Sequence, residues 1–145
     1  MANLNDTKQN TRGPKNNSPL YATGGRMLPH DKDIEEAVLG ALMLEKDAYS
    51  SVCDILKPES FYEPSNQIIY EAIQSLGAAQ QPIDMLTVVE KLRQMDKIDS
   101  VGGPLFISEL TSRVASGAHI EYHARIIAQK YLARELIRFS TEVES

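Results

Sequence analysis

The sequence predicts an all-α fold, with a compact head of about five short helices followed by one long helix. The first observation is that apolar residues recur at intervals of three and four along most of the chain after residue 27, which is the spacing of one helix face. The second is that prolines and glycines stand where such stretches begin and end. The third is that residues 118–143 contain neither proline nor glycine, so one helix can continue through them.

Length and composition predict one soluble domain. The chain has 145 residues, which is enough to bury a core but too few for a core and a separate catalytic domain. No apolar run approaches the roughly 20 residues that span a membrane, and no secretory signal pattern opens the chain. The single cysteine, Cys53, excludes an intrachain disulfide framework. We therefore expect a protein of the reducing cytoplasm.

Residues 1–27 are expected to form a disordered, Asn-rich tail, because they hold too few large apolar residues to offset the entropy of ordering them. Four cations and one anion, Asp6, give this tail a net charge of 4 − 1 = +3. Such a tail can attract DNA only weakly and without regard to sequence. An inert tail is the preferred interpretation. The cations are Lys8, Arg12, Lys15 and Arg26.

The first helix is expected within residues 28–44, where the sequence changes from tail to packed structure. Asp31 is the expected N-cap, and the acidic residues that follow it suit the positive end of the helix dipole. Gly40 lies in mid-helix at a cost of about 1 kcal/mol relative to Ala, so we expect another helix to approach closely there. The predicted apolar face consists of Ile34, Ala37, Val38, Ala41, Leu42 and Leu44.

Two further helices are expected between Asp47 and Gly77. The second has Cys53 on its core-facing side and is ended by Pro58. The third begins with Pro64 at its first position and stops at Gly77. Each has apolar residues at helical spacing.

The last two helices of the head are predicted from their first residues. Asp84 is the expected N-cap of the fourth helix. Gly102 and Gly103 form a tight turn, and Pro104 is the expected first residue of the fifth helix. A break is expected at residues 112–117, so the head comprises residues 28–117.

Residues 118–145 are expected to form the long helix, and its stretch without proline or glycine, residues 118–143, would be about 39 Å long over 26 residues. Its apolar residues fall on two overlapping stripes. A single partner surface cannot cover both stripes, so we predict an oligomer contact. The residues expected to contact another protomer, or a second helix of a hairpin, are Ile120, Ile127, Tyr131, Leu132, Leu136 and Phe139.

The charge of the head disfavours direct binding to nucleic acid. Residues 28–118 hold seven cationic and fifteen acidic residues, a net charge of 7 − 15 = −8, whereas residues 119–145 hold four of each. An acidic surface repels phosphate. A basic protein partner is therefore easier to accommodate than DNA.

Several short motifs together resemble the N-terminal domain of bacterial replicative DNA helicases of the DnaB family. In the first half they are Pro29-His30, Glu35, Val38-Leu39-Gly40, Leu42-Met43-Leu44, Phe61-Tyr62, Ile68 and Ile69. In the second half they are Pro82-Ile83-Asp84, Thr87, Glu90, Leu92, the turn from Ile98 to Gly103, Leu110, Tyr122-His123-Ala124, Ile126-Ile127, Arg134, Glu135 and Ile137. The chain departs from the family at Ile98, where leucine is usual, and at His119, where asparagine is more frequent.

The resemblance implies a non-catalytic collar domain. In the family, these domains pair through helical hairpins, receive the C-terminal domain of primase and belong to a hexameric ring on which helicase loaders act. It implies that the long helix is the first arm of such a hairpin, and that a second arm, a linker and an ATP- and Mg-dependent motor that contacts DNA lie outside this chain. The sequence contains no G-x-x-x-x-G-K-[ST] phosphate-binding motif. We therefore expect no catalytic residue, cofactor or metal in this part.

Other interpretations of the residues are weaker. His119 and His123 share a helix face but lack a further metal ligand nearby in sequence. The pair Glu35-Glu36 is explained by solvated charges at a helix start, without acid-base chemistry. A helical DNA-binding regulator remains the alternative function, although the third and fourth helices lack the cations of a recognition helix.

Overall fold

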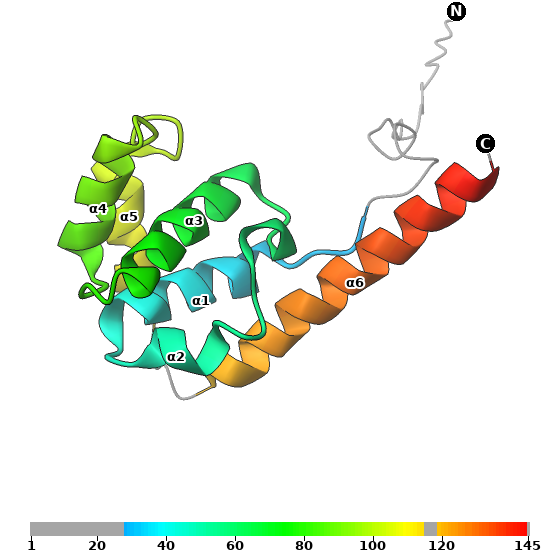
Figure 1. The fold of residues 1–145 in the computed structure, drawn as a ribbon, viewed down its shortest axis with the longest axis horizontal. Helices are drawn as coiled ribbons and strands as arrows, with labels where there is room; N and C mark the ends of the chain where they lie inside the picture. The colour runs from blue at the N-terminus through cyan, green and yellow to red at the C-terminus, as the bar shows by residue number, and fades with distance from the viewer. Residues whose placement is uncertain (1–27, 115–118, 145) are drawn as a thin grey trace, which may run out of the picture.

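The computed structural model describes residues 28–114 and 119–144, which are helical and contain no strand (Figure 1). This confirms the all-α prediction. The tail at residues 1–27, residues 115–117 of the break expected at 112–117, Ala118 and Ser145 lie outside the described residues. The elements are α1 (Lys32–Leu44), α2 (Ala48–Val52), the 3-10 turn η2 (Pro58–Ser60), α3 (Pro64–Ala78), α4 (Met85–Gln94), α5 (Gly103–Ser112) and α6 (Ile120–Glu144).

Helix α1 is the centre of the fold. It contacts α3, α5 and α6, while α4 packs against α3 and α5 at the far side of the head. The first half of α6 lies along α1, α2 and η2, and its second half extends beyond the head (Figure 1). The head is therefore covered by α6 on one side only, and the end of α6 is held at a distance from it.

The start and the buried face of α1 follow the sequence pattern. The carboxylate of Asp31 accepts a hydrogen bond from the backbone N–H of Ile34 at 3.1 Å, which caps the helix. Val38 and Leu42 are fully buried. Leu44 was predicted on the same apolar face, but it is 54% exposed. Successive helix residues turn by about 100°, so Leu44 points away from Leu42, and the prediction for Leu44 is wrong.

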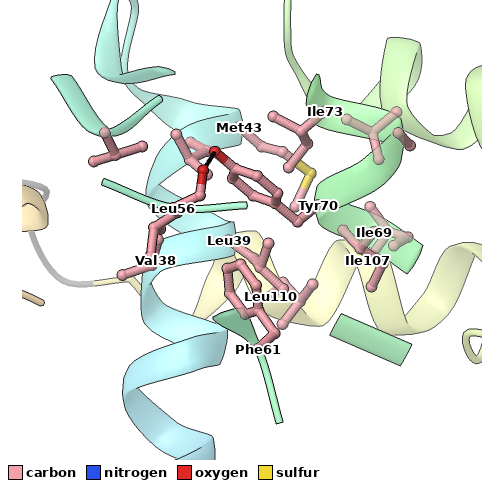
Figure 2. Close-up of a cluster of buried hydrophobic side chains, with 14 of the residues drawn as sticks. Val38, Leu39, Met43, Leu56, Phe61, Ile69, Tyr70, Ile73, Ile107 and Leu110 are labelled. Carbon is pink, nitrogen blue, oxygen red and sulfur yellow. Dashed lines mark hydrogen bonds between the residues drawn. The ribbon is translucent and has the colours of Figure 1, made fainter. Parts of the chain in front are cut away.

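The core lies between α1, α3 and α5 (Figure 2). Phe61 and Tyr70 pack there with ring centroids 5.1 Å apart, and both are fully buried. The Tyr70 hydroxyl donates a hydrogen bond to the backbone carbonyl of Leu56 at 3.2 Å, drawn as the dashed line in Figure 2. The single polar atom of this aromatic pair is therefore satisfied inside the core.

Two glycines lie where another element comes close. A Cβ atom on Gly40 would lie 2.3 Å from the backbone oxygen of Leu110, so α1 and α5 cross at this glycine. A Cβ atom on Gly77 would lie 2.4 Å from the ring of Tyr49. Gly77 was predicted to end α3, but the helix continues to Ala78, so that prediction is wrong. Packing against the Tyr49 ring is the physical reason for this glycine.

The remaining helix starts confirm the predicted cap at Asp84 and the turn at Gly102 and Gly103, and α5 begins one residue earlier than predicted. Asp84 caps α4 through a reciprocal pair of hydrogen bonds with Thr87, each 2.9 Å long. Gly102 and Gly103 have φ of 112° and 77°, and the Gly103 N–H closes the turn on the Ile98 carbonyl at 2.9 Å. Gly103 is the first residue of α5, so Pro104 is the second residue and not the first.

Helix α2 is shorter than predicted. It ends at Val52, and Cys53 follows it as an exposed C-cap. The prediction that Cys53 faces the core is therefore wrong, because α2 ends before that position can turn inward. Pro58 begins the 3-10 turn η2.

Candidate protein interaction site on the long helix

One face of α6 packs against the head of its own chain. Ala124 and Ile127 belong to the buried core, and Ile120 is partly buried against it. Tyr131 continues this face and is half-buried. Ile120, Ile127 and Tyr131 were predicted to contact another protomer or a second hairpin helix; in this structure they lie on the side of α6 that faces the head, and their contact with another helix stays a prediction.

The other apolar stripe of α6 is open to solvent. Leu132, Leu136 and Phe139 are 60%, 62% and 67% exposed, and no described part of the chain covers them. They stand at i, i+4 and i+7, so they form one continuous row that we call the outer stripe. Scattered apolar residues are ordinary on a surface, but an aligned row of large ones marks an interaction site. The structure therefore leaves half of the predicted interface residues available.

A buried arginine stands where α6 leaves the head. Arg134 is 3% exposed, and its two terminal nitrogens donate hydrogen bonds to the backbone carbonyls of Pro29 and Ser60, each at 2.9 Å. Its guanidinium carbon lies 5.3 Å from the ring centre of Tyr62 and 5.7 Å from that of Tyr131. Burial lowers the pKa of Arg134, while the nearby Glu35 carboxylate opposes this shift. We call this arrangement the Arg134 junction.

The aromatic rings of the junction have further partners. The ring of His30 stacks on Tyr62 with centroids 3.9 Å apart and an angle of 10° between the planes. The ammonium group of Lys57 lies 5.3 Å from the ring centre of Tyr131. The segment before α1, the segment around η2 and α6 therefore meet at one layered cluster of rings and cations.

Glu35 is a buried carboxylate that binds the start of α3. It is 2% exposed and accepts hydrogen bonds from the backbone N–H of Tyr62 at 2.7 Å, that of Glu63 at 3.3 Å and the side-chain amide of Asn66 at 3.0 Å. Glu63, at the N-cap of α3, makes no cap with its own side chain. Glu35 therefore supplies from α1 an acceptor for the two N–H groups that lead into α3 and for the Asn66 side chain, while the N–H groups of Asn66 and Gln67 bond the Glu63 carbonyl.

The expectation that Glu35 and Glu36 are solvated is therefore wrong. Glu36 is 6% exposed and forms an ion pair with Arg113, which follows α5. The signal that reveals Glu35 is its place in the apolar pattern, three and four residues before Val38 and Leu39. A charged residue in a core position requires a buried partner. This requirement explains why Glu35 and Glu36 are buried and not solvated.

The same signal applies to Arg134. It stands three residues after Tyr131 and seven after Ile127, so it shares the inner face of α6. Sequence reasoning treated it only as part of a family motif and did not assign it a structural position. Its place on an apolar face indicates that the guanidinium group is buried.

No catalytic constellation emerges from the described residues. His119 and His123 lie with ring centroids 6.4 Å apart, but within residues 28–114 and 119–144 no three His, Cys, Asp or Glu side chains are grouped to hold a metal ion. None of the described helices is long and apolar enough to cross a membrane.

The head carries its own exposed apolar side chain beside two grooves of α4. Leu86 is 73% exposed and lines both grooves. One groove, with a cavity volume of about 400 Å³, is bounded by Leu76, Pro82 and Lys91. The other is bounded by Val89 and residues at the start of α5. These features suit a protein partner better than a small substrate.

The sequence and fold were compared with those of known proteins. Residues 27–129 match the family described as the DnaB-like helicase N terminal domain. The chain is 44% identical over 115 residues to the replicative DNA helicase DnaB of Rhodothermus marinus, covering 79% of this chain and 12% of that protein. It is 36% identical over 118 residues to the replicative DNA helicase DnaC of Bacillus subtilis, covering 81% of this chain and 26% of that protein. The chain thus spans a small part of these relatives.

Solved structures show the same similarity. The crystal structure of the N-terminal domain of DnaB helicase from Mycobacterium tuberculosis superimposes with a TM-score of 0.78 at 36% identity, with 81% of each chain covered. A DnaB-like replicative helicase, whose structure was described together with its interactions with primase, superimposes with a TM-score of 0.70 at 25% identity, covering 78% of this chain and 27% of that one. From its sequence and its fold, the chain therefore belongs to the family of DnaB-like helicase N-terminal domains.

Proposed function

We propose that this chain serves as the non-catalytic collar domain of a hexameric replicative DNA helicase. In this role it self-associates through α6 and provides a docking surface for primase or a helicase loader. The single observation that carries the proposal is the outer stripe of α6, which is exposed on a helix that extends beyond the head. Family membership supplies the replication context.

The enzymatic activity belongs, in this proposal, to a longer protein of the bacterial cytoplasm. That protein hydrolyses ATP with Mg²⁺ and unwinds DNA through a separate motor. The relatives are named replicative DNA helicases and are several times longer than the part matched here. This chain contains no P-loop sequence, so its own contribution is assembly and recruitment.

The outer stripe favours a second copy of the same helix as its partner. Burial of a large apolar side chain contributes roughly 1.5–3 kcal/mol, so covering Leu132, Leu136 and Phe139 provides a substantial driving force for association. An ion pair between Glu121 and Arg125, 2.7 Å long, lies further toward the start of the helix. In a two-fold arrangement the same row would face itself, as in most symmetric dimers.

Self-association is tested by placing a charge in the middle of the row. We expect sedimentation equilibrium of the 145-residue chain to show association that Leu136→Lys abolishes, because the ammonium group would be buried without a partner. Thr141→Lys is the matched control, since Thr141 is exposed on a different side of α6. Wild-type protein that remains monomeric at all concentrations, or Leu136→Lys that associates like wild type, would refute the proposal.

Partner docking needs a separate experiment. We expect calorimetric titration with the C-terminal domain of the primase from the same organism to give heat, and the two proteins to co-elute. Leu86→Lys is an informative variant, because Leu86 is the exposed apolar side chain between the grooves of α4. A titration with neither heat nor co-elution would count against docking on this chain.

A helical DNA-binding regulator is the alternative function. The net charge of −8 over residues 28–118 opposes it, because an acidic surface repels phosphate. Sequence-dependent retardation of duplex DNA at physiological salt would favour the regulator over the collar domain.

A further inference from the structure

Arg134 lies near the end of the part of α6 that packs against the head. Among the described side chains of α6, which end at residue 142, it is the last that is buried. Residues 135–144, here called the distal segment, extend past it, and this segment carries Leu136 and Phe139. Arg134 therefore holds α6 at the point where the distal segment begins.

The contacts that precede Arg134 do not determine this direction by themselves. Ala124 and Ile127 pack into the core through apolar contacts, which are non-directional and tolerate some rotation of a helix. Hydrogen bonds, in contrast, weaken steeply when donor and acceptor are misaligned. The Arg134 junction is the place where α6 makes such bonds to the head.

The geometry of the guanidinium group makes these bonds restrictive. Its nitrogens are fixed in one plane, and two of them bond carbonyls from different segments, Pro29 before α1 and Ser60 at the end of η2. The guanidinium carbon lies over the rings of Tyr62 and Tyr131, and the stacked ring of His30 supports Tyr62 from the other segment. We expect a tilt of α6 to misalign these hydrogen bonds, because their acceptors lie on two different segments.

Stability alone does not explain an arginine at this position. Burial of a guanidinium group carries a desolvation penalty, and an apolar side chain of similar volume commonly fills such a space equally well. No carboxylate lies within ion-pair distance of Arg134 among the described residues; its hydrogen-bond acceptors are carbonyl oxygens. The arginine therefore contributes directional bonds that an apolar residue cannot provide.

We propose that Arg134 is a positioning residue that sets the direction of the distal segment of α6. The segment is about 15 Å long at 1.5 Å per residue, so a tilt of about 15° at Arg134 would move its end by roughly 4 Å. Phe139 lies about 7.5 Å past Arg134 and would move by roughly 2 Å, which would misalign the far end of the outer stripe with a partner helix. The consequence for association rests on the proposed self-association, but the positioning role does not.

The direction of the distal segment can be measured within one molecule. Cys53 is exposed on the head and is the single cysteine, and Ser140 is exposed on the distal segment, so Cys53 and Ser140→Cys provide two sites for spin labels. Pulsed electron paramagnetic resonance would measure the distance between the labels, with excess unlabelled protein to suppress distances between molecules. In the otherwise wild-type chain we expect one narrow distribution.

Three variants separate the possible roles of the side chain. Arg134→Met removes both hydrogen bonds, and we expect the distribution to broaden or to shift by roughly 2 Å, the movement of residue 140 for the same tilt. Arg134→Lys keeps the charge and most of the stem but loses the planar fork, so we expect it to broaden as well. Arg138→Met is the matched control, since Arg138 is exposed and bonds Glu135 on its own helix, and we expect no change.

The outcomes distinguish this inference from the proposed function. A wild-type distribution in both Arg134 variants, with circular dichroism showing a folded chain, would overturn the positioning role. A wild-type distribution in Arg134→Lys alone would also overturn the positioning role. In that case a positive charge would be enough to hold the distal segment, without the planar guanidinium group. If wild type associates, we expect the dimer dissociation constant of Arg134→Met to rise about tenfold, through lost preorganisation. Broadened distributions with a monomeric wild type would support positioning and refute only self-association.

Discussion

Replacing Glu35 by glutamine is expected to destabilise the head strongly, although the two side chains have almost the same shape. The Glu35 carboxylate accepts hydrogen bonds from Tyr62, Glu63 and Asn66, and hydrogen bonds to a charged group contribute about 1.5–3 kcal/mol each. In the variant, the glutamine NH₂ group must face either the Tyr62 N–H or the other two donors. At least one buried donor then lacks an acceptor, and we expect a loss of roughly 3–5 kcal/mol in the free energy of unfolding.

The assay is urea unfolding followed by circular dichroism, supported by thermal melts. For a chain of this length the expected loss corresponds to a decrease in melting temperature of roughly 10–15 °C. Glu36→Gln is the matched control, because Glu36 is also buried but its partner Arg113 is 56% exposed and can return to water. We expect that control to cost less than about 1 kcal/mol. Equal stability of Glu35→Gln and wild type, or a larger loss in Glu36→Gln, would refute the role of Glu35 as the buried acceptor at the start of α3.

Three further predictions concern the head. Gly40→Ala should lower the free energy of unfolding by about 1–3 kcal/mol in urea melts, because the added Cβ would meet the backbone oxygen of Leu110. Gly77→Ala should cost less, because its added Cβ would meet the ring of Tyr49, which can move. Burial raises the pKa of Tyr70, so the unfolded state ionises first and stability should fall as pH rises past about 10; Tyr70→Phe should reduce that dependence. Asp84→Ala should cost about 1 kcal/mol in thermal melts, and an unchanged melt would contradict its capping role.

Local sequence signals predicted the elements of this fold well. Asp31 and Asp84 mark helix starts because their carboxylates satisfy nearby N–H groups, a contact contained within four residues of sequence. The apolar spacing of α1 likewise identifies Val38 and Leu42 as buried. These predictions succeed because the interactions that decide them are local.

Predictions that depend on distant partners were less successful. Both stripes of α6 are apolar, and periodicity does not tell which of them the head covers, so Ile127 and Leu136 received the same assignment. Arg134 distinguishes the two stripes, because it lies on the same face as Ile127. A buried arginine requires buried hydrogen-bond acceptors, so this is the face that the head covers. Glu35 was misassigned for a related reason, because its donors lie 27 to 31 residues away.

The hydrogen bonds of Glu35 also affect how the chain folds. Helix α3 begins at Pro64 without a side-chain cap from Glu63, and the two N–H groups that lead into it gain their acceptor only when α1 lies beside them. Helix nucleation is unfavourable, and an acceptor supplied by another helix couples the formation of α3 to its docking on α1. The two helices should therefore form in a single cooperative step, and the amide hydrogens of Tyr62 and Glu63 should exchange with solvent only when the whole head opens.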